Sequence, residues 1–210
     1  MITTDYKPLS LTQSITHWAN WPMEITYHQP VLTDEVIDGL NVLPGGNYID
    51  CTAGQGGHTE AILLRCTPEG NVLALDLDPS AINSTRSRLR SYTDNLNLFQ
   101  ISYTELDIAN KQSGLSHIDG ILFDLGLSSF QLDNSDRGFS FKRDESLDMR
   151  FDPMGDVTAY DIINSYNEEH IENILLSYGE ETRAKTIARR IVENRPVSYT
   201  HLTLPTSDLV

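Results

Sequence analysis

The sequence predicts an α/β fold built on a parallel sheet. Two observations lead to this prediction. Short apolar strand patterns alternate with helical patterns between residues 48 and 124, and a glycine-rich turn at Gly54, Gly56 and Gly57 follows the first strand. Strands separated by helices form right-handed βαβ units whose strands run parallel. A chain of 210 residues with 39% hydrophobic residues has enough apolar side chains for one domain with a small insert.

The elements of the sheet region follow one another in order. The spacing of Val36, Ile37 and Leu40 predicts a short helix that starts near Thr33 and stops before Pro44. The next expected elements are a strand ending at 48–50, a helix over 59–65, a strand over 71–76, a helix from 79 to about 90, and strands over 96–101 and 118–124. Asp78-Pro79 is an N-cap followed by proline at the first helical position. The strand over 118–124 is apolar enough to be buried on both faces.

The character of the sequence changes after Asp124. Residues 125–153 are rich in Gly, Ser, Asp and Arg and predict a loop with short turns. Asn167 can cap a helix, and a second helical face follows Gly179. The apolar positions of these two helices are Ile171, Ile174, Leu175 and Tyr178, then Ile187, Ala188, Ile191 and Val192. Residues 1–27 show no sustained period and predict an irregular N-terminal arm.

Charge and composition exclude several classes of protein. Fifteen basic and thirty acidic residues give a net charge of −15, which argues against a purely electrostatic nucleic-acid binder but is compatible with a local basic patch. No secretory signal and no membrane-spanning run is apparent, so a cytoplasmic protein is expected. Cys51 and Cys66 are expected to be buried small hydrophobic residues. No metal site is predicted, because His28 lacks a partner at ligand spacing.

The glycine-rich turn and the next strand predict a site for an adenosine-containing ligand. Glycines let the backbone approach a ligand across the carboxyl ends of the strands, and Asp76, which ends the second strand, can accept hydrogen bonds from two ribose hydroxyls. The third glycine of a dinucleotide site is replaced by Thr59. Asp50 suits an ammonium group, which favours S-adenosylmethionine over a dinucleotide. The alternative is a tight structural turn that binds nothing.

Three further side chains are candidates for the same crevice. Asp124 ends the fourth strand, where an α/β sheet holds its reacting groups, and it can accept a hydrogen bond from an amine; the alternative is a capping role. Tyr103 can lie against adenine or belong to the core. Gln131 can face adenine or solvent.

Two basic segments have competing interpretations. Arg137 and Arg150 lie among aromatic residues and can hold phosphates beside an extruded base, but nearby aspartates favour an internally paired loop. The segment over 183–195 has five basic and three acidic residues. A solvated helix face is favoured there over an RNA-binding patch.

Seven short motifs follow one another between Tyr27 and Arg195. They are His28-Gln-Pro-Val-Leu32, Asp50-Cys-Thr-Ala-Gly-Gln-Gly-Gly-His58, Asp124-Leu-Gly-Leu-Ser-Ser129, Arg137-Gly-Phe-Ser-Phe141, Leu147-Asp-Met-Arg150, Tyr178-Gly-Glu-Glu181 and Ile187-Ala-Arg-Arg-Ile191. Together they resemble the RsmH (MraW) family of ribosomal RNA small-subunit methyltransferases H. The resemblance implies a Rossmann-like class I methyltransferase domain over 28–127 and a helical substrate-recognition insert over 128–196.

The resemblance also implies an activity. The family uses S-adenosylmethionine to methylate N4 of one cytidine in the decoding centre of 16S rRNA. By position, it implies cofactor contacts from Gly56, Gly57, His58, Asp76, Asp124 and Gln131, whereas Tyr103 stands where the family usually has phenylalanine. We expect Asp124, with the backbone carbonyls of 125–127, to accept an N–H of the cytosine amine and so to be the catalytic residue.

The C-terminal end departs from the family. The family has a late Phe-His-Ser-Leu-Glu-Asp motif that this chain lacks, and Val197-Ser-Tyr-Thr-His-Leu-Thr-Leu-Pro-Thr206 resembles a translated sequencing adapter. We therefore expect residues 197–210 to be an artefactual tail and the fourth strand to be an uncovered apolar edge. Such an edge is an aggregation site and can leave the fragment unstable and inactive. A nicotinamide-dependent oxidoreductase and a non-catalytic RNA-binding factor are the two alternative functions.

Overall fold

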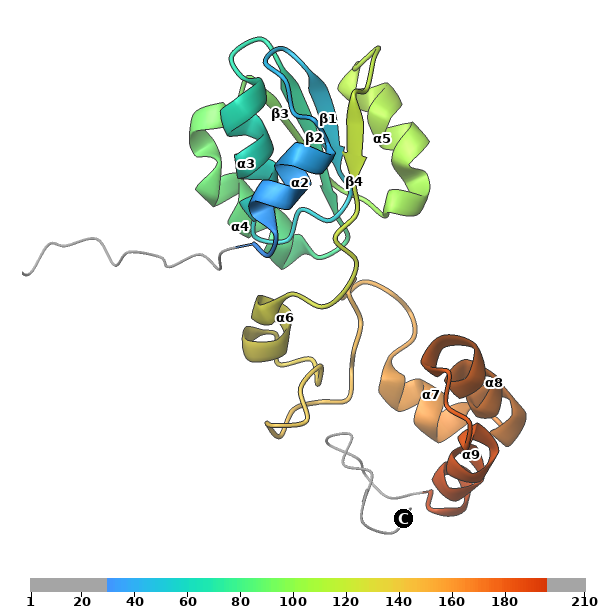
Figure 1. The fold of residues 1–210 in the computed structure, drawn as a ribbon. Helices are drawn as coiled ribbons and strands as arrows, with labels where there is room; N and C mark the ends of the chain where they lie inside the picture. The colour runs from blue at the N-terminus through green and yellow to red at the C-terminus, as the bar shows by residue number, and fades with distance from the viewer. Residues whose placement is uncertain (1–29, 196–210) are drawn as a thin grey trace, which may run out of the picture.

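A four-stranded parallel sheet forms the centre of the upper body in Figure 1, with strand order β3-β2-β1-β4. The computed structural model describes residues 30–195. The strands are β1 (Asn47–Asp50), β2 (Asn71–Asp76), β3 (Leu96–Gln100) and β4 (Gly120–Leu122). β1 pairs with β2 from Asn47 opposite Asn71 to Asp50 opposite Ala74. The parallel sheet confirms the predicted α/β class, and β2 has the predicted bounds.

Helices cover both faces of this sheet. On one face, α2 (Thr33–Gly39), α3 (Gly57–Cys66) and the end of α4 (Pro79–Arg88) contribute to one core cluster, which includes Ile62, Leu63 and Leu89. On the other face, α5 (Leu106–Ser113) supplies Ala109 to a second cluster. Two 3-10 turns, η1 (Arg90–Tyr92) and η2 (Tyr103–Glu105), flank β3. The two faces are therefore separate apolar layers on either side of the sheet.

Alternating side chains of the central strands supply both layers. Tyr48 and Val72 belong to the cluster on the α3 side, whereas Ile49 and Leu73 belong to the cluster on the α5 side. A strand turns successive side chains to opposite faces, so a strand that is apolar at every position is buried twice. This is why β1 and β2 have almost no accessible surface.

The α4 helix begins as the sequence predicts. Asp78 is its N-cap, and its carboxylate accepts a hydrogen bond of 2.9 Å from the Ser80 backbone N–H. Pro79 occupies the first helical position. A backbone N–H at this position has no acceptor within the helix, so the N–H that proline lacks costs no hydrogen bond. The same Asp78 side chain is buried and makes further contacts, described below.

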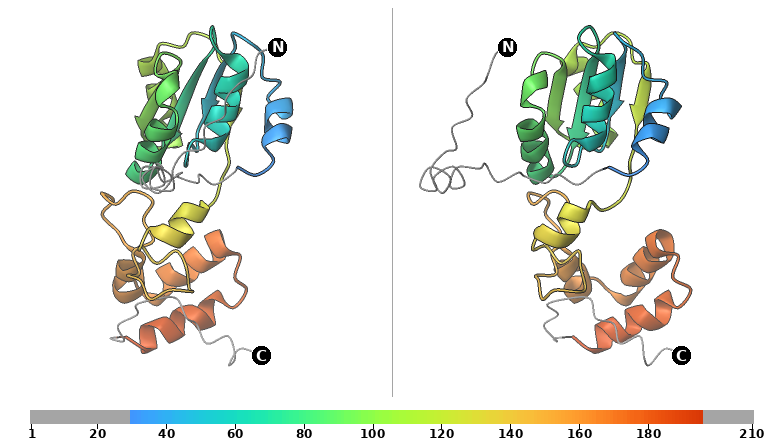
Figure 2. Two further views of the ribbon diagram at one scale, coloured as in Figure 1. Left: turned by 90° about the vertical axis from the view of Figure 1, so that its left-hand side faces the viewer. Right: turned by 60° about the vertical axis from the view of Figure 1, so that its left-hand side comes forward.

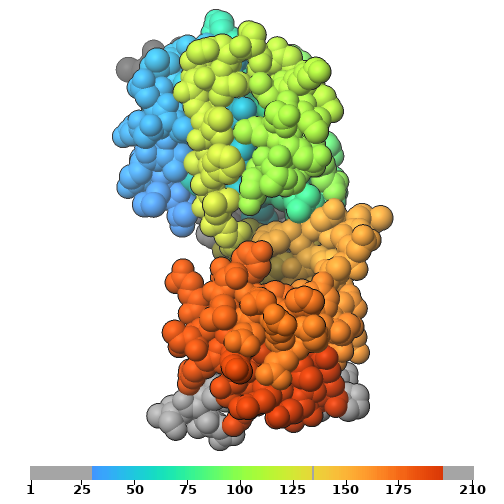
Figure 3. Space-filling view, turned by 90° about the vertical axis from the view of Figure 1, so that its right-hand side faces the viewer, coloured from blue at the N-terminus to red at the C-terminus, as the bar shows by residue number. Residues whose placement is uncertain are grey.

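The fourth strand is the uncovered edge that was expected, but it is shorter than predicted and its faces are not both buried. A strand over 118–124 with both faces buried was expected, but β4 covers only Gly120–Leu122 and lies at the edge of the sheet. Ile121 is 44% exposed, and Phe123 just beyond the strand is half-exposed. Figure 3 shows the yellow-green segment through β4 uncovered along one face of the molecule. The apolar run is an exposed edge because no strand pairs with its outer side among the described residues.

The segment after β4 forms a second, helical body at the carboxyl ends of the strands (Figures 1 and 2). It contains α6 (Ser129–Asn134), α7 (Ala159–Ser165), α8 (Glu168–Gly179) and α9 (Ala184–Glu193). α8 starts at the predicted cap, because Asn167 accepts a 2.9 Å hydrogen bond from His170 N. The expected loop over 125–153 contains the short helix α6, and neither α5 nor α7 was predicted.

Some expectations fall outside the described residues. The N-terminal arm over 1–27, His28, and the tail over 197–210 are among them. Cys51 and Cys66 are free and buried, as predicted. Within residues 30–195, none of the helices combines the length and the apolar character that crossing a membrane requires.

Candidate functional site

A cavity of about 620 Å³ opens at the carboxyl ends of the parallel strands. Its walls come from four strand ends: the turn after β1, residues 76–78 after β2, residues 101–103 after β3, and residues 124–131 after β4. Phe151 completes the lining from the helical body. The sheet topology therefore brings together residues that are far apart in the sequence, at the edge where α/β proteins bind their ligands.

Asp50 stabilises the turn that forms one wall of this cavity. Its carboxylate is fully buried and accepts hydrogen bonds from the Thr59 hydroxyl (2.6 Å) and from the Thr52 backbone N–H (3.1 Å). Burial raises the pKa of Asp50, and the hydrogen bonds from Thr59 and Thr52 oppose that effect. Asp50 is not among the lining residues, so the expectation that it would face a ligand's ammonium group is wrong. It fixes the shape of the turn instead.

The three glycines of the turn have different positions. Gly54 and Gly57 line the cavity, whereas Gly56 does not. Gly56 has a φ of 79°, and a Cβ atom there would lie 3.1 Å from Thr85 Cγ2 of α4. Gly56 therefore allows α4 to approach the turn.

Asp76 lies in the cavity wall at the end of β2. One carboxylate oxygen accepts a hydrogen bond from Gly54 N at 2.8 Å and the other accepts one from Asp78 N at 2.9 Å. Burial raises the pKa of Asp76 above its ordinary value, against the hydrogen bonds from the two amides. A carboxylate has about four acceptor positions, so this side chain can still accept hydrogen bonds from a ligand.

Asp124 and His58 face each other across the cavity. Asp124 Oδ2 lies 3.5 Å from His58 Nε2, and the Asp124 backbone N–H donates to the Thr52 hydroxyl at 2.8 Å. The Asp124 side chain is 52% exposed, whereas His58 is buried. His58 Nδ1 is buried and has no hydrogen-bond partner among residues 30–195. The pair thus combines an accessible carboxylate with a buried polar atom that lacks a hydrogen-bond partner in the described part of the chain.

Tyr103 and Gln131 also line the cavity, but in different ways. The Tyr103 ring is half-exposed and meets Phe123 edge-on, with centroids 5.7 Å apart. The Gln131 amide is occupied: its Oε1 accepts from Ser128 N (3.0 Å) and its Nε2 donates to Asp78 (3.1 Å). Gln131 is therefore the capping-box residue of α6, which Ser128 three positions earlier could have indicated.

The arginines after α6 have acidic partners. Arg137 pairs with Asp78, Arg143 with Glu145, and Arg150 with Asp148. The hydrogen bonds from Arg150 hold the pKa of Asp148 below its ordinary value, against burial. The favoured interpretation of an internally paired loop is confirmed for Arg150, whose partner is a nearby aspartate, but not for Arg137, whose acidic partner lies outside the loop. The pairing of Arg137 with Asp78, which was predicted only as a helix cap, connects two bodies and was not predicted.

The basic segment over 183–195 separates into two groups. Arg195 donates hydrogen bonds to the backbone carbonyls of Ile163 (2.6 Å) and Tyr166, at the end of α7. Lys185, Arg189 and Arg190 lie on the exposed side of α9, opposite the buried Ala184, Ile187 and Ala188. Arg195 is thus a structural contact, and the cations on α9 form the exposed face that the helical spacing indicates.

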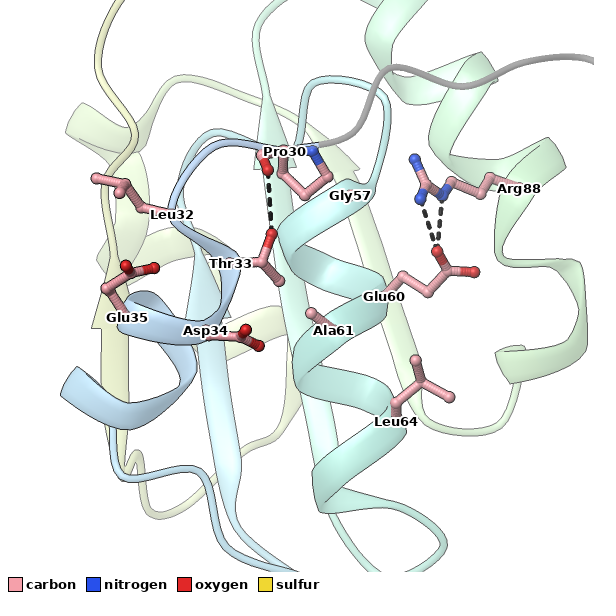
Figure 4. Close-up of a pocket in the computed structure, with 10 residues that line it drawn as sticks. All are labelled: Pro30, Leu32, Thr33, Asp34, Glu35, Gly57, Glu60, Ala61, Leu64 and Arg88. Carbon is pink, nitrogen blue, oxygen red and sulfur yellow. Dashed lines mark hydrogen bonds and ion pairs between the residues drawn. The ribbon is translucent and has the colours of Figure 1, made fainter.

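A second cavity, of about 540 Å³, lies beside α2 and α3 (Figure 4). Glu60 and Arg88 form an ion pair at one side of it, with Nη2 2.7 Å from Oε2, and the Thr33 hydroxyl donates to the Pro30 carbonyl at the other. No strand-end carboxylate lines this cavity. The cavity at the carboxyl ends is therefore the stronger candidate for a nucleotide-type ligand.

The chain is similar in sequence to known proteins. The sequence model of the MraW methylase family matches residues 25–210, a range that includes the segment expected to be artefactual. The chain is similar to the ribosomal RNA small subunit methyltransferase H of Brevibacillus brevis, with 46% identity over 80% of this chain and 54% of the relative. It is 42% identical to that of Fusobacterium nucleatum, over 88% of this chain and 58% of the relative.

The chain spans about half the length of the curated relatives it matches. Among solved structures, an rRNA methylase from Streptococcus thermophilus is similar, with a TM-score of 0.37 and 22% identity over 48% of this chain and 57% of that one.

Proposed function

Because this chain belongs to the MraW methylase family, we propose that its strand-end cavity binds S-adenosylmethionine and serves methyl transfer to N4 of one cytidine in the decoding centre of 16S rRNA. The relatives at 42–46% identity carry the name ribosomal RNA small subunit methyltransferase H, which supports a small-subunit rRNA substrate. The observation that carries the proposal is the position of Asp76 and Asp124 in one cavity, at the carboxyl ends of β2 and β4, the parallel strands on either side of β1.

The residues of the cavity fit an adenosine ligand with an amino-acid end. Asp76 has free acceptor positions for the two ribose hydroxyls, and Tyr103 offers a half-exposed ring to the adenine. Gly54 and Gly57 bring bare backbone to the ligand. His58 also lines the cavity, and its Nδ1 is buried with no hydrogen-bond partner among residues 30–195. Gln131 also lines the cavity, and only one of its two amide N–H groups donates to Asp78, whereas Gly56 supports the turn by allowing α4 to approach it.

The chemistry needs an acceptor for a proton of the amine. Bound in this cavity, S-adenosylmethionine supplies an electrophilic methyl group on a sulfonium. Asp124 presents an accessible carboxylate that can accept one N–H of the cytosine amine, and with it the proton that the nitrogen loses. His58 fixes the carboxylate from behind, and the Thr52 hydroxyl holds the Asp124 backbone. The catalytic residue is therefore Asp124.

The helical body is the proposed recognition part for RNA. In this proposal residues 28–127 form the methyltransferase domain and residues 128–196 form the substrate-recognition insert. A base must leave its stack to reach a cavity at a strand edge. Action on the small ribosomal subunit places the protein in the cytoplasm.

Titration of the 210-residue chain with S-adenosylhomocysteine and, separately, with NAD tests the cofactor. We expect binding of the first at micromolar concentrations, about −8 kcal/mol, and no binding of the second. Asp76→Asn should weaken binding. The matched control Asp94→Asn removes an exposed carboxylate just before β3, at the opposite end of the strands, and should bind normally.

A second experiment tests the reaction. Small ribosomal subunits are incubated with methyl-labelled cofactor, and the nucleosides are separated after digestion. Label in N4-methylcytidine supports the proposal. Labelled product of any other nucleoside contradicts the substrate atom, and rRNA binding without label in any nucleoside favours a non-catalytic RNA-binding protein.

A further inference from the structure

A buried polar link joins the sheet to the helical body beside the candidate cofactor cavity. Its centre is the Asp78 carboxylate, which is 1% exposed. Besides capping α4 through Ser80, this carboxylate accepts hydrogen bonds from Gln131 Nε2 (3.1 Å) and from Arg137 Nη2. An N-cap needs only its own helix as a donor, so the two additional donors from the helical body are not explained by capping.

Arg137 connects this carboxylate to the far wall of the cavity. Its Nη1 donates to the backbone carbonyls of Arg150 (2.8 Å) and Phe151 (2.9 Å) while Nη2 donates to Asp78. The guanidinium also lies 5.4 Å from the centroid of the Phe139 ring, which in turn packs 5.4 Å from the Phe151 ring. One side chain therefore holds Asp78 and Phe151, both of which line the cavity.

Because this link is buried, the interaction between its two charges is strong. The Arg137 side chain is only 12% exposed. Burial alone would raise the pKa of Asp78, but the hydrogen bonds from Arg137, Ser80 and Gln131 outweigh it and keep the pKa below its ordinary value. Removing one partner of a buried ion pair leaves the other charge uncompensated, unlike the loss of an exposed pair.

The backbone around Arg137 is shaped to make these contacts. Met149 N donates to the Arg137 carbonyl at 2.8 Å, so the chain before Phe151 runs beside Arg137. Asp136 and Met149 have φ angles of 53° and 58°, which are uncommon for side chains other than glycine. Such angles persist only where the surroundings fix them, and here they flank the two ends of the Arg137 contact.

From these contacts we infer that Arg137 is a positioning residue for the cofactor site, fixing Phe151 as a wall of the cavity by fastening its backbone to Asp78. The inference rests on the proposed function, because it takes the ligand of the cavity to be S-adenosylmethionine. The inference also means that the helical body completes the cofactor site. The cavity is then complete only when this body contacts the N-terminal end of α4, where Asp78 lies. Neither Arg137 nor Asp78 touches the reacting atoms in this role.

A double-mutant cycle on binding of S-adenosylhomocysteine tests the inference. The variants are Arg137→Gln, Phe151→Ala and the double variant, and the dissociation constants are measured by calorimetry on the 210-residue chain. Each single variant should weaken binding about tenfold, and the double variant should be no weaker than the weaker single variant, because the two residues act on the same wall. Two independent effects would instead multiply to about a hundredfold.

The matched control is Phe141→Ala, which removes another aromatic ring from the same segment. Phe141 is 72% exposed and does not line the cavity. Alone it should leave the affinity unchanged, and combined with Arg137→Gln it should give the affinity of Arg137→Gln. If Arg137→Gln fails to give a cooperative thermal transition, Arg137→Lys takes its place in the cycle. Lysine keeps the charge but lacks the planar fork that reaches two carbonyls and a carboxylate.

The outcomes separate this inference from the proposed function. Normal binding by the parent chain together with multiplied losses in the double variant overturns the positioning role alone. Unchanged affinity in Arg137→Gln also overturns it. A parent chain that does not bind S-adenosylhomocysteine overturns both the cofactor assignment and the positioning role.

Discussion

Two aspartates at the ends of neighbouring strands have opposite surroundings and therefore different uses. Asp50 is enclosed and spends its acceptor positions on Thr52 and Thr59, whereas Asp76 keeps acceptor positions toward the cavity. Burial raises the pKa of both carboxyls. A buried carboxylate is retained where its hydrogen bonds offset the loss of hydration. At Asp50 these bonds shape the turn, and at Asp76 they leave room for a ligand.

The raised pKa of Asp76 predicts that cofactor binding weakens in acid. A carboxyl with a raised pKa takes up its proton at a higher pH than usual, and the protonated form loses acceptor strength toward ribose hydroxyls. The dissociation constant for S-adenosylhomocysteine should therefore rise as the pH is lowered from about 8 to about 5. Asp76→Asn removes the carboxyl that takes up the proton and leaves His58 unchanged. This variant should bind S-adenosylhomocysteine weakly, and its dissociation constant should depend less on pH. Parallel profiles for the two proteins would contradict this assignment.

Asp124→Ala tests the catalytic role at the same scale. The variant should lose methyl transfer to small ribosomal subunits by a factor of about 10² or more, because it removes the acceptor for the amine proton. It should keep its thermal transition, because the Asp124 side chain is 52% exposed. Asp124→Asn retains an acceptor oxygen without the charge, so its rate of methyl transfer should lie between the rates of the parent and of Asp124→Ala. Transfer at the parent rate by the alanine variant refutes the role.

At the scale of elements, β4 is the least protected part of the sheet. It is short, it lies at the edge, and the half-exposed Ile121 and Phe123 stand on it or next to it. An exposed apolar edge can pair with the edge of another chain, and charged residues prevent this. By contrast, β1 and β2 lie between neighbours and bury their side chains on both faces.

Ile121→Lys should therefore reduce self-association of the chain. A lysine on the edge places a charge where a second copy would have to pair. Sedimentation velocity at several protein concentrations should show a smaller associated fraction for the variant than for the parent. The control is Leu64→Lys, which changes an exposed leucine on α3, away from the edge. Equal effects of the two substitutions would show that general solubility, and not the edge, is responsible.

At the scale of the whole molecule, the net charge of −15 opposes both self-association and contact with RNA. Local features must therefore supply the attraction that the overall charge does not. The exposed cations on α9 are one such feature, although Glu193 lies on the same helix and Arg183 pairs with Glu181.

Salt should increase self-association through the β4 edge. Raising the salt concentration from about 0.01 M to about 0.15 M shortens the Debye length from about 30 Å to about 8 Å and screens the repulsion between acidic chains. The associated fraction of the parent chain should rise over this range, and that of Ile121→Lys should rise less. A fraction that falls with added salt would show that attraction between opposite charges drives the association.

Much of the fold could be predicted from the sequence, because many local signals agree with the tertiary structure. The Asp78-Pro79 cap, the bounds of β2 and the cap at Asn167 depend on residues close together in sequence. The uncovered edge at β4 was expected, but its length and the burial of both its faces were predicted wrongly, and α5 and α7 were not predicted. An apolar run has the same pattern whether or not neighbouring strands cover it, so the exposure of Ile121 depends on strand order and not on the run itself.

The candidate site was predictable in composition but not in detail. Sequence alone determined the alternation of strands and helices, the glycine-rich turn, and the presence of Asp76 and Asp124 at strand ends, because spacing and backbone preference are local properties. Only the tertiary structure decided that Asp50 is fully enclosed, that the Gln131 amide donates to Asp78, and that Arg137 reaches Asp78. Those contacts join residues up to 59 positions apart, and their partners are fixed by the packing of the two bodies.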